Sequence, residues 1–217
     1  MNQQLFEQVD HYIEHLLATE DEAMKATVAS IDANNIPQIS VSATQGKFLQ
    51  VLAKMCNAKR ILEVGTLAGY STIWMARALP ETGKLISLEY DPHHAHVAQQ
   101  NIRNAALENI VEVHIGAALD LLPTMEGTFD MIFIDADKQP YAEYFAWALK
   151  LSRQGTIIVA DNVIREGKVL DAGTKDDKVL GVQRFNRMLS ESEAVTAIIL
   201  QQVGMKDHDG MAIAVVN

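Results

Sequence analysis

The sequence predicts an α/β fold: a doubly wound, mostly parallel seven-stranded sheet that follows a helical N-terminal segment. After Lys59, short apolar runs alternate with segments of helical periodicity, which is typical of βαβ units. Before Lys59, apolar residues recur at helical spacing. A chain of 217 residues can bury one full-sized core. We therefore expect a single domain over 1–217, with 1–58 as a helical extension within it.

Three helices are expected in the N-terminal extension. In the first, the apolar side chains form one stripe made of Leu5, Val9, Tyr12, Ile13, Leu16 and Leu17. The second covers 21–33 and is ended by two asparagines and Pro37. The third begins near Ser42 and places Phe48, Leu49, Leu52 and Met55 on one face.

The remaining apolar runs predict the strands of the sheet. Five strands are expected at 61–64, 85–88, 111–115, 131–134 and 156–160, and the helices between them at 71–79, 92–107, 117–124 and 141–151. A helix at 179–190 then precedes two strands at 194–201 and 211–216. The short link around 204–210 allows a hairpin, and hence one antiparallel edge strand.

Composition excludes several classes of partner. The 18 Lys and Arg against 28 Asp and Glu leave a net charge of −10, which disfavours nucleic acid. Cys56 is the single cysteine, so an intramolecular disulfide and a thiolate zinc cage are excluded. No apolar run approaches the roughly 20 residues of a membrane helix, and the polar start is unlike a secretory signal. We expect a cytoplasmic protein without a membrane partner.

The segment from Arg60 to Thr72 predicts a strand, a tight turn and the start of a helix, capped by Ser71 or Thr72. Gly65 and Gly69 form G-x-x-x-G, which differs from G-x-G-x-x-G and lacks the Gly-Lys-Ser/Thr of a P-loop. A nucleoside without a pyrophosphate is therefore the favoured ligand. Glu89 ends the next strand, where a carboxylate can accept hydrogen bonds from both hydroxyls of a ribose.

Acidic residues follow two strands that are neighbours in the doubly wound order. Asp135 follows the fourth strand and Asp161 follows the fifth. Neighbouring strands lie about 4.8 Å apart in a sheet. Such carboxylates repel unless a proton or cation lies between them, and Asn162 adds a neutral oxygen. This set suits Mg²⁺, Mn²⁺ or Ca²⁺, although both aspartates could instead be caps or loop residues. Lys138 is a candidate base whose pKa would be lowered beside such a dication, or else a surface lysine.

Five motifs in order carry a family resemblance: VSATQGKFL, ILEVGTLAGYST, ISLEYDP, IFIDADKQPY and VADNVI. The sequence resembles the class I S-adenosylmethionine-dependent O-methyltransferases of the caffeoyl-CoA and catechol O-methyltransferase type, particularly small bacterial members. The resemblance runs from about Ser40 to Asn162 and more weakly to the C-terminus. It implies a Rossmann-like methyltransferase fold and, as in similar proteins, a homodimer.

The resemblance also implies roles for individual residues. Those implied around S-adenosylmethionine are Ser42, Ala43, Glu63, Gly65, Tyr70, Ser71, Glu89, Gly116, Ala117 and Asp135. Of these, Ser42 and Ala43 lie at the carboxylate end, Glu89 at the ribose, and Gly116 and Ala117 at the adenine. The implied metal ligands are Asp135, Asp161 and Asn162, and Lys138 is the implied base. The chain departs from the pattern at Ala118, where some relatives have serine, and over 203–210.

The expected activity is divalent-metal-dependent transfer of the methyl group of S-adenosylmethionine to a hydroxyl of a catechol-like, ortho-dihydroxy aromatic molecule. Alternatives are an NAD(P)-dependent oxidoreductase, which the glycine loop disfavours, and a methyltransferase with another small acceptor. A non-catalytic binding module is a third reading. The natural acceptor, the possibility of a CoA thioester, the regiochemistry and the metal stay open. So does segment 165–177, which is either a substrate lid or a surface insertion.

Overall fold

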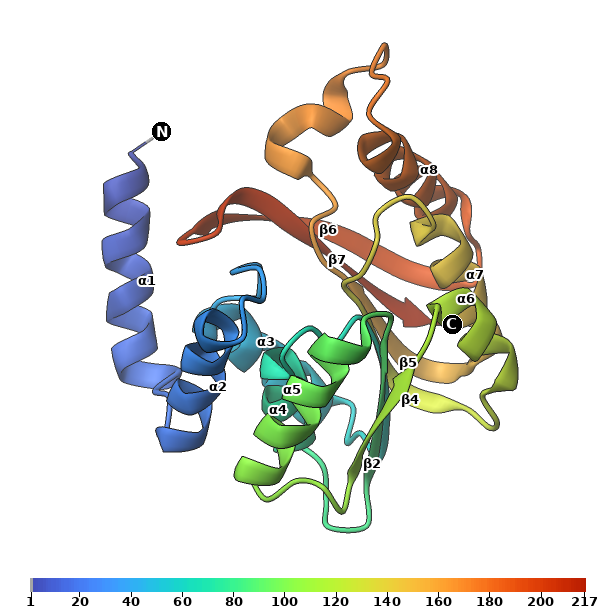
Figure 1. Cartoon of the computed structure of the whole chain (residues 1–217). Helices are drawn as coiled ribbons and strands as arrows, with labels where there is room; N and C mark the ends of the chain where they lie inside the picture. Colours follow the sequence, from blue (N-terminus) through green and yellow to red (C-terminus); the bar gives the residue numbers. More distant parts are fainter. Residues whose placement is uncertain (1) are drawn as a thin grey trace.

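The computed structural model describes residues 2–217 and contains a seven-stranded sheet of order β3-β2-β1-β4-β5-β7-β6 (Figure 1). The strands are β1 Arg60–Val64, β2 Lys84–Glu89, β3 Val111–Ile115, β4 Phe129–Ile134, β5 Ser152–Ala160, β6 Val195–Gly204 and β7 Asp207–Val216. Strands β1 to β5 are mutually parallel, and β7 pairs antiparallel with β5 and β6. The predicted fold class is confirmed. The antiparallel strand of this edge is β7, and β6 lies outermost.

Helices cover both faces of this sheet. They are α1 Gln3–Leu17, α2 Glu22–Ala33, α3 Ala43–Met55, α4 Tyr70–Ala76, α5 Pro92–Asn104, α6 Ala118–Leu121, α7 Tyr141–Lys150 and α8 Asp177–Glu191, with short 3₁₀ segments η1 Leu122–Thr124 and η2 Arg165–Leu170. Residues of α3, α4 and α5 share one core cluster, and those of α7 and α8 share a second on the other face (Figure 1). Over 2–217, none of these helices is long and apolar enough to cross a membrane.

The two cores explain why the sequences of the central strands are continuous apolar runs. In β4, Met131 and Phe133 enter the core under α3 to α5, whereas Ile132 and Ile134 enter the core under α7 and α8. All four side chains are at most 1% exposed. A strand that is covered on both faces has no polar side to alternate with.

Several boundaries differ from the sequence prediction. Helix α4 ends at Ala76 instead of Leu79, and α6 is a single turn. The expected cap of α4 by Ser71 or Thr72 is wrong. Its N-cap is Gly69, in a left-handed conformation and without a side-chain cap, since both hydroxyls donate to Glu63 instead.

The C-terminal hairpin is longer than predicted. Strands β6 and β7 stay paired up to Gly204 and Asp207, so the link consists of Met205 and Lys206 alone. Helix α1 contacts this tip: the Gln3 side chain donates to the Gly204 carbonyl at 2.7 Å, and Asp10 accepts from the Met205 N–H at 2.8 Å. These contacts with α1, which is distant in the sequence, therefore stabilise the turn. The residues of the turn do not by themselves predict where it lies.

Segment 165–177 begins with η2 and leads into α8. Gln183 of α8 donates to the carbonyls of Val169 and Asp171 at 3.0 and 2.9 Å, while Leu170 is 86% exposed. These bonds tie one side of the segment to α8. Its role as a substrate lid stays a prediction.

Candidate active site

The carboxyl ends of β1, β4 and β5 bring the predicted site residues together. The Asp135 N–H donates to the Val64 carbonyl at 2.8 Å, and the Asp161 N–H donates to the Ile134 carbonyl at 3.0 Å. The parallel hydrogen-bond pattern thus continues one residue past each strand. Both aspartates therefore start from fixed backbone positions at the edge where ligands bind in open α/β sheets.

Gly65 allows the glycine loop to pass close to Asp135. Its φ is +98°, a conformation that favours glycine, and a Cβ at this position would overlap the Asp135 carbonyl oxygen. Any side chain here would push the β1 loop away from the β4 loop. The first glycine of G-x-x-x-G is thus required by backbone packing between these two loops.

Gly65→Ala should lower the free energy of unfolding by at least about 2 kcal/mol more than Gly155→Ala does. Gly155 has a similar φ of +83°, but a Cβ there would meet no atom within 4 Å. Its substitution therefore measures the backbone strain alone, about 1–2 kcal/mol. Urea unfolding of both variants supplies the comparison. Equal losses would show that the approach to Asp135 has no energetic consequence.

Glu63 is fully buried beneath the start of α4. Its carboxylate accepts hydrogen bonds from the hydroxyls of Ser71, Thr72 and Ser87 at 2.5, 2.5 and 2.6 Å. Glu63 is therefore neither exposed to solvent nor open to the crevice at the carboxyl edge of the sheet. A ligand would reach it through Ser71, which is partly exposed. Burial raises the pKa of Glu63 to about 7, although the three hydroxyls oppose the shift.

Glu63 should make the protein less stable as pH rises from about 4.5 to about 7. Because the folded-state pKa lies above the usual 4.5, the folded state binds more protons than the unfolded state in this window. Glu63→Gln cannot ionise, so its stability relative to the wild type should increase across the window by about 3 kcal/mol. Urea unfolding at several pH values tests this, with the exposed Glu81→Gln as control. A pH-independent difference would refute it.

Glu89 holds the glycine loop from the end of β2. One carboxylate oxygen accepts from the N–H groups of Thr66 and Leu67 at 3.1 and 2.8 Å, and the other accepts from the Asp91 N–H at 2.9 Å. The Gly116 N–H donates to the Glu89 carbonyl at 2.8 Å. The residues assigned to the ribose and the adenine therefore lie side by side, with Ala117 next along the chain.

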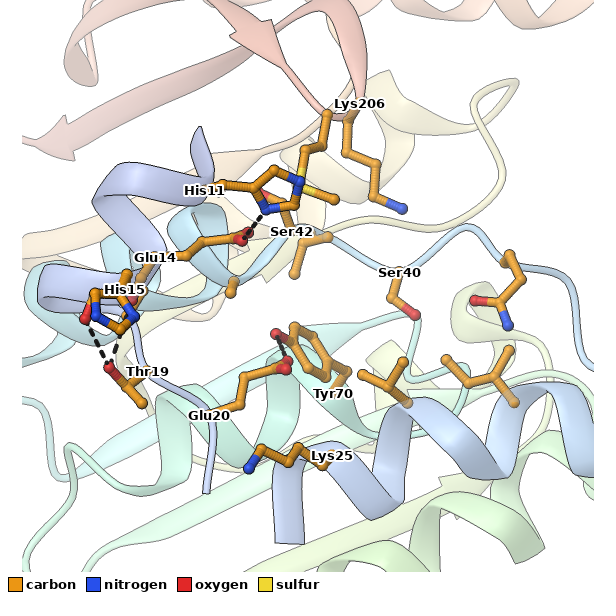
Figure 2. A pocket seen from close by; sticks show the side chains of 17 residues that line it. His11, Glu14, His15, Thr19, Glu20, Lys25, Ser40, Ser42, Tyr70 and Lys206 are labelled. Atoms are coloured by element: carbon orange, nitrogen blue, oxygen red, sulfur yellow. Dashed lines mark hydrogen bonds and ion pairs between the residues drawn. The ribbon is translucent and has the colours of Figure 1, made fainter. Parts of the chain in front are cut away.

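Ser42, Ala43 and Tyr70 line a cavity of about 470 Å³ between the N-terminal helices and the glycine loop (Figure 2). Ser42 caps α3, because its hydroxyl accepts from the Gln45 N–H at 3.2 Å. The Tyr70 hydroxyl donates to Glu20 at 2.5 Å across the cavity wall. Burial and this bond raise the pKa of Tyr70, so it stays a neutral phenol.

Asp135, Lys138 and Asp161 form the charged part of the site. The Lys138 ammonium lies 2.8 Å from a carboxylate oxygen of Asp135 and 2.5 Å from the Tyr141 hydroxyl. Burial disfavours the ammonium, but the negative charge of Asp135 outweighs it and raises the pKa of Lys138. This ion pair was not visible in the sequence, and the lowered pKa that is expected for Lys138 beside a dication stays a prediction.

Asp161 is 2% exposed and accepts a hydrogen bond from the Asn162 N–H at 2.8 Å. Burial, followed by the negative charge of Asp135, raises the pKa of Asp161 to about 8. Asn162 has a φ of +57°, a conformation that asparagine tolerates better than most residues. The predicted ligands thus meet at the ends of two adjacent strands.

Comparison with known proteins identifies the family. A family model described as O-methyltransferase matches residues 14–215. The chain belongs to the O-methyltransferase family. The catechol O-methyltransferase of Niastella koreensis is 61% identical over 100% of both chains. That of Mycobacterium tuberculosis is 46% identical over 96% of this chain and 94% of its own. The O-methyltransferase TomG of Streptomyces achromogenes, solved with SAM, is 44% identical with a TM-score of 0.97, covering 100% of this chain and 99% of TomG.

The resemblance carried by the five motifs is thereby confirmed, and the protein is an S-adenosylmethionine-dependent O-methyltransferase. This membership excludes the NAD(P)-dependent oxidoreductase. The candidate residues of this O-methyltransferase occupy the carboxyl edge of the sheet, which is where open α/β sheets bind ligands.

The donor set of the O-methyltransferase fits a hard divalent cation. Over residues 2–217, no three His, Cys, Asp or Glu side chains cluster as a metal site. Asp135, Asp161 and Asn162 instead offer two carboxylates and one amide, the oxygen ligands that Mg²⁺, Mn²⁺ and Ca²⁺ prefer. Burial and the negative charge of Asp135 both disfavour the ionised form of Asp161, and a bound dication would compensate that charge.

Two residues beside the candidate site of this O-methyltransferase were not singled out in the sequence. Tyr141 is fully buried and joins Lys138 to the Asp161 carbonyl, to which its hydroxyl donates at 3.0 Å. Its spacing of three residues from Lys138, in the first turn of α7, could have indicated it. Lys206 lies at the hairpin tip and carried no signal, because its place depends on how the hairpin packs against α1 and α3.

Proposed function

We propose that this O-methyltransferase moves the methyl group of S-adenosylmethionine to one hydroxyl of a catechol-like, ortho-dihydroxy aromatic acceptor. We also propose that the reaction requires a divalent cation, with Mg²⁺ as the first candidate. The observation that carries the proposal is the juxtaposition of Asp135 and Asp161 at adjacent strand ends, with the Lys138 ammonium 2.8 Å from Asp135. The names of the relatives from Niastella koreensis and Mycobacterium tuberculosis support the acceptor class.

Each residue then has a defined task. Glu89 would accept the ribose hydroxyls, Gly116 and Ala117 would contact the adenine, and Ser42, Ala43, Gly65, Tyr70 and Ser71 would surround the methionine part, with Glu63 behind Ser71. Asp135, Asp161 and Asn162 would hold the cation, which when bound lowers the pKa of an aromatic hydroxyl. Lys138 would act as the neutral amine, a form that is favoured once the negative charge of Asp135 is neutralised. Its Nζ would then accept the hydroxyl proton as the new O–CH₃ bond forms and the sulfonium S–CH₃ bond breaks.

Methyl transfer from labelled S-adenosylmethionine to a panel of small catechols, with Mg²⁺ and with EDTA, tests the proposal. We expect methylated product with Mg²⁺ and none with EDTA. Transfer that persists in EDTA would disprove the metal requirement. A protein that binds the cofactor but methylates no catechol would move the acceptor to another class of small molecule.

We also propose a homodimer that pairs the exposed faces of α1. Leu5, Val9, Tyr12 and Leu16 lie on one stripe of this helix and are 45–67% exposed, and none of its residues is buried. A second copy would cover this apolar stripe. Light scattering should report twice the mass of the chain, and Leu16→Lys should shift the protein toward monomer. A wild-type monomer would disprove the proposal.

A further inference from the structure

Two cavities meet between the N-terminal helices and the sheet. The cavity lined by Ser42, Ala43 and Tyr70 has a volume of about 470 Å³. The second, of about 360 Å³, is lined by Asp161 and Asn162. Four residues line both cavities: Ser40, Val41, Ser42 and Lys206. Lys206 is the charged member of this junction.

Lys206 presents a cation to the junction without a direct counter-ion. Figure 2 shows its side chain extending from the β6–β7 hairpin into the cavity that also contains Ser42. Among residues 2–217, no carboxylate lies within 4.0 Å of its ammonium. Although the residue is exposed overall, partial burial lowers the pKa of Lys206, an effect that the charges of Asp135 and Asp161 oppose.

Two carboxylates that line the second cavity with Lys206 accept hydrogen bonds from backbone N–H groups. Asp10 accepts from the Met205 N–H at 2.8 Å, and Asp209 accepts from the N–H groups of Ile164 and Arg165, each at 2.9 Å. These bonds hold the hairpin tip against α1 and the β5 loop. The tip therefore places the Lys206 ammonium, while Asp10 and Asp209 hold the backbone around it.

Ser40 supplies a second polar group at the junction. Its hydroxyl is buried and, over the described residues, has no hydrogen-bond partner. A buried hydroxyl usually has such a partner, and leaving it without one costs about 1–3 kcal/mol. A hydroxyl donor and an ammonium in one junction are the groups that a carboxylate ligand would satisfy.

We propose that Lys206 and Ser40 form an anion-binding site that takes the carboxylate of a bound ligand where the two cavities meet. The inference rests on the proposed function for the identity of the ligands. Two ligands could bring this chemistry: the α-carboxylate of the cofactor, from the cavity lined by Ala43 and Tyr70, or a carboxylate on the acceptor, from the cavity lined by Asp161.

Calorimetric binding of matched pairs distinguishes these sources without relying on turnover. The cofactor pair is S-adenosylhomocysteine and 5′-methylthioadenosine, which lacks the amino-acid carboxylate. The acceptor pair is 3,4-dihydroxybenzoate and catechol. Lys206→Met should weaken the carboxylate-bearing member of one pair about tenfold and leave its partner unchanged. Ser40→Ala should weaken the same member less, and Lys206→Arg should restore most of the affinity.

Lys25→Met is the matched control, because Lys25 lines the first cavity from the opposite side in Figure 2 and pairs with Glu22 at 3.0 Å. A Lys206→Met variant that binds all four compounds like the wild type overturns the proposal, as does one that weakens all four equally. If the wild type binds neither acceptor compound, the proposed catechol acceptor fails, and the cofactor pair alone decides the role of Lys206.

Discussion

Asp161→Ala should abolish metal-supported methyl transfer, lowering kcat about a thousandfold or more, while the Kd of S-adenosylhomocysteine changes less than about twofold. The side chain is 2% exposed, and the pKa of its carboxyl is raised by burial and by Asp135, so this carboxylate is stable as an anion chiefly when a cation neutralises it. Without it, Asp135 would be the one carboxylate left in the proposed ligand set. The cofactor residues around Glu89 belong to β2 and the glycine loop and do not depend on it.

Asp137→Ala is the control for this variant, since Asp137 is an exposed carboxylate two residues after Asp135 and should be replaceable without loss. Calorimetric titration with Mg²⁺ gives a second readout, and binding should disappear in Asp161→Ala. A parallel loss of turnover and of S-adenosylhomocysteine affinity would mean that Asp161 supports the cofactor pocket and that the metal site lies elsewhere.

Lys138→Ala should lower kcat by about 10²- to 10⁴-fold and change KM for the acceptor by less than about threefold. The Lys138 side chain is buried between Asp135 and the Tyr141 hydroxyl, so its Nζ is held in one position instead of sampling solvent. A base acts in the transition state more than in substrate binding, which is why kcat carries the effect. Initial rates over a range of catechol concentrations separate the two constants.

Lys138→Arg separates proton transfer from charge. Arginine keeps the positive charge beside Asp135 but does not release its proton in proteins. A slow Lys138→Arg enzyme supports the base, whereas near-wild-type turnover would reduce Lys138 to a charge that positions Asp135. Lys150→Ala, at the end of α7 where the ammonium lies over Trp147, should leave both constants unchanged.

Much of the fold and part of the site could be predicted because the signals are local. The run Phe129–Ile134 is apolar at nearly every position since both faces of β4 are covered, and the residue after it, Asp135, must then lie at the carboxyl edge. The same reasoning placed Asp161 after β5 and Glu89 at the end of β2. The right-handed connections that parallel strands require limit the strand orders that these elements can adopt.

The sequence by itself therefore determined the doubly wound sheet, the glycine loop and the side-by-side carboxylates, because apolar patterns and the ends of strands can be identified from consecutive residues. The environment of each charged group was decided by the tertiary structure. Burial and three hydroxyls from two elements set the state of Glu63, an ion pair raises the pKa of Lys138, and contacts between α1 and the hairpin place Lys206. Desolvation and charge interactions involve segments that are far apart in the chain, so the pKa shifts they cause cannot be predicted from the residues next to each group.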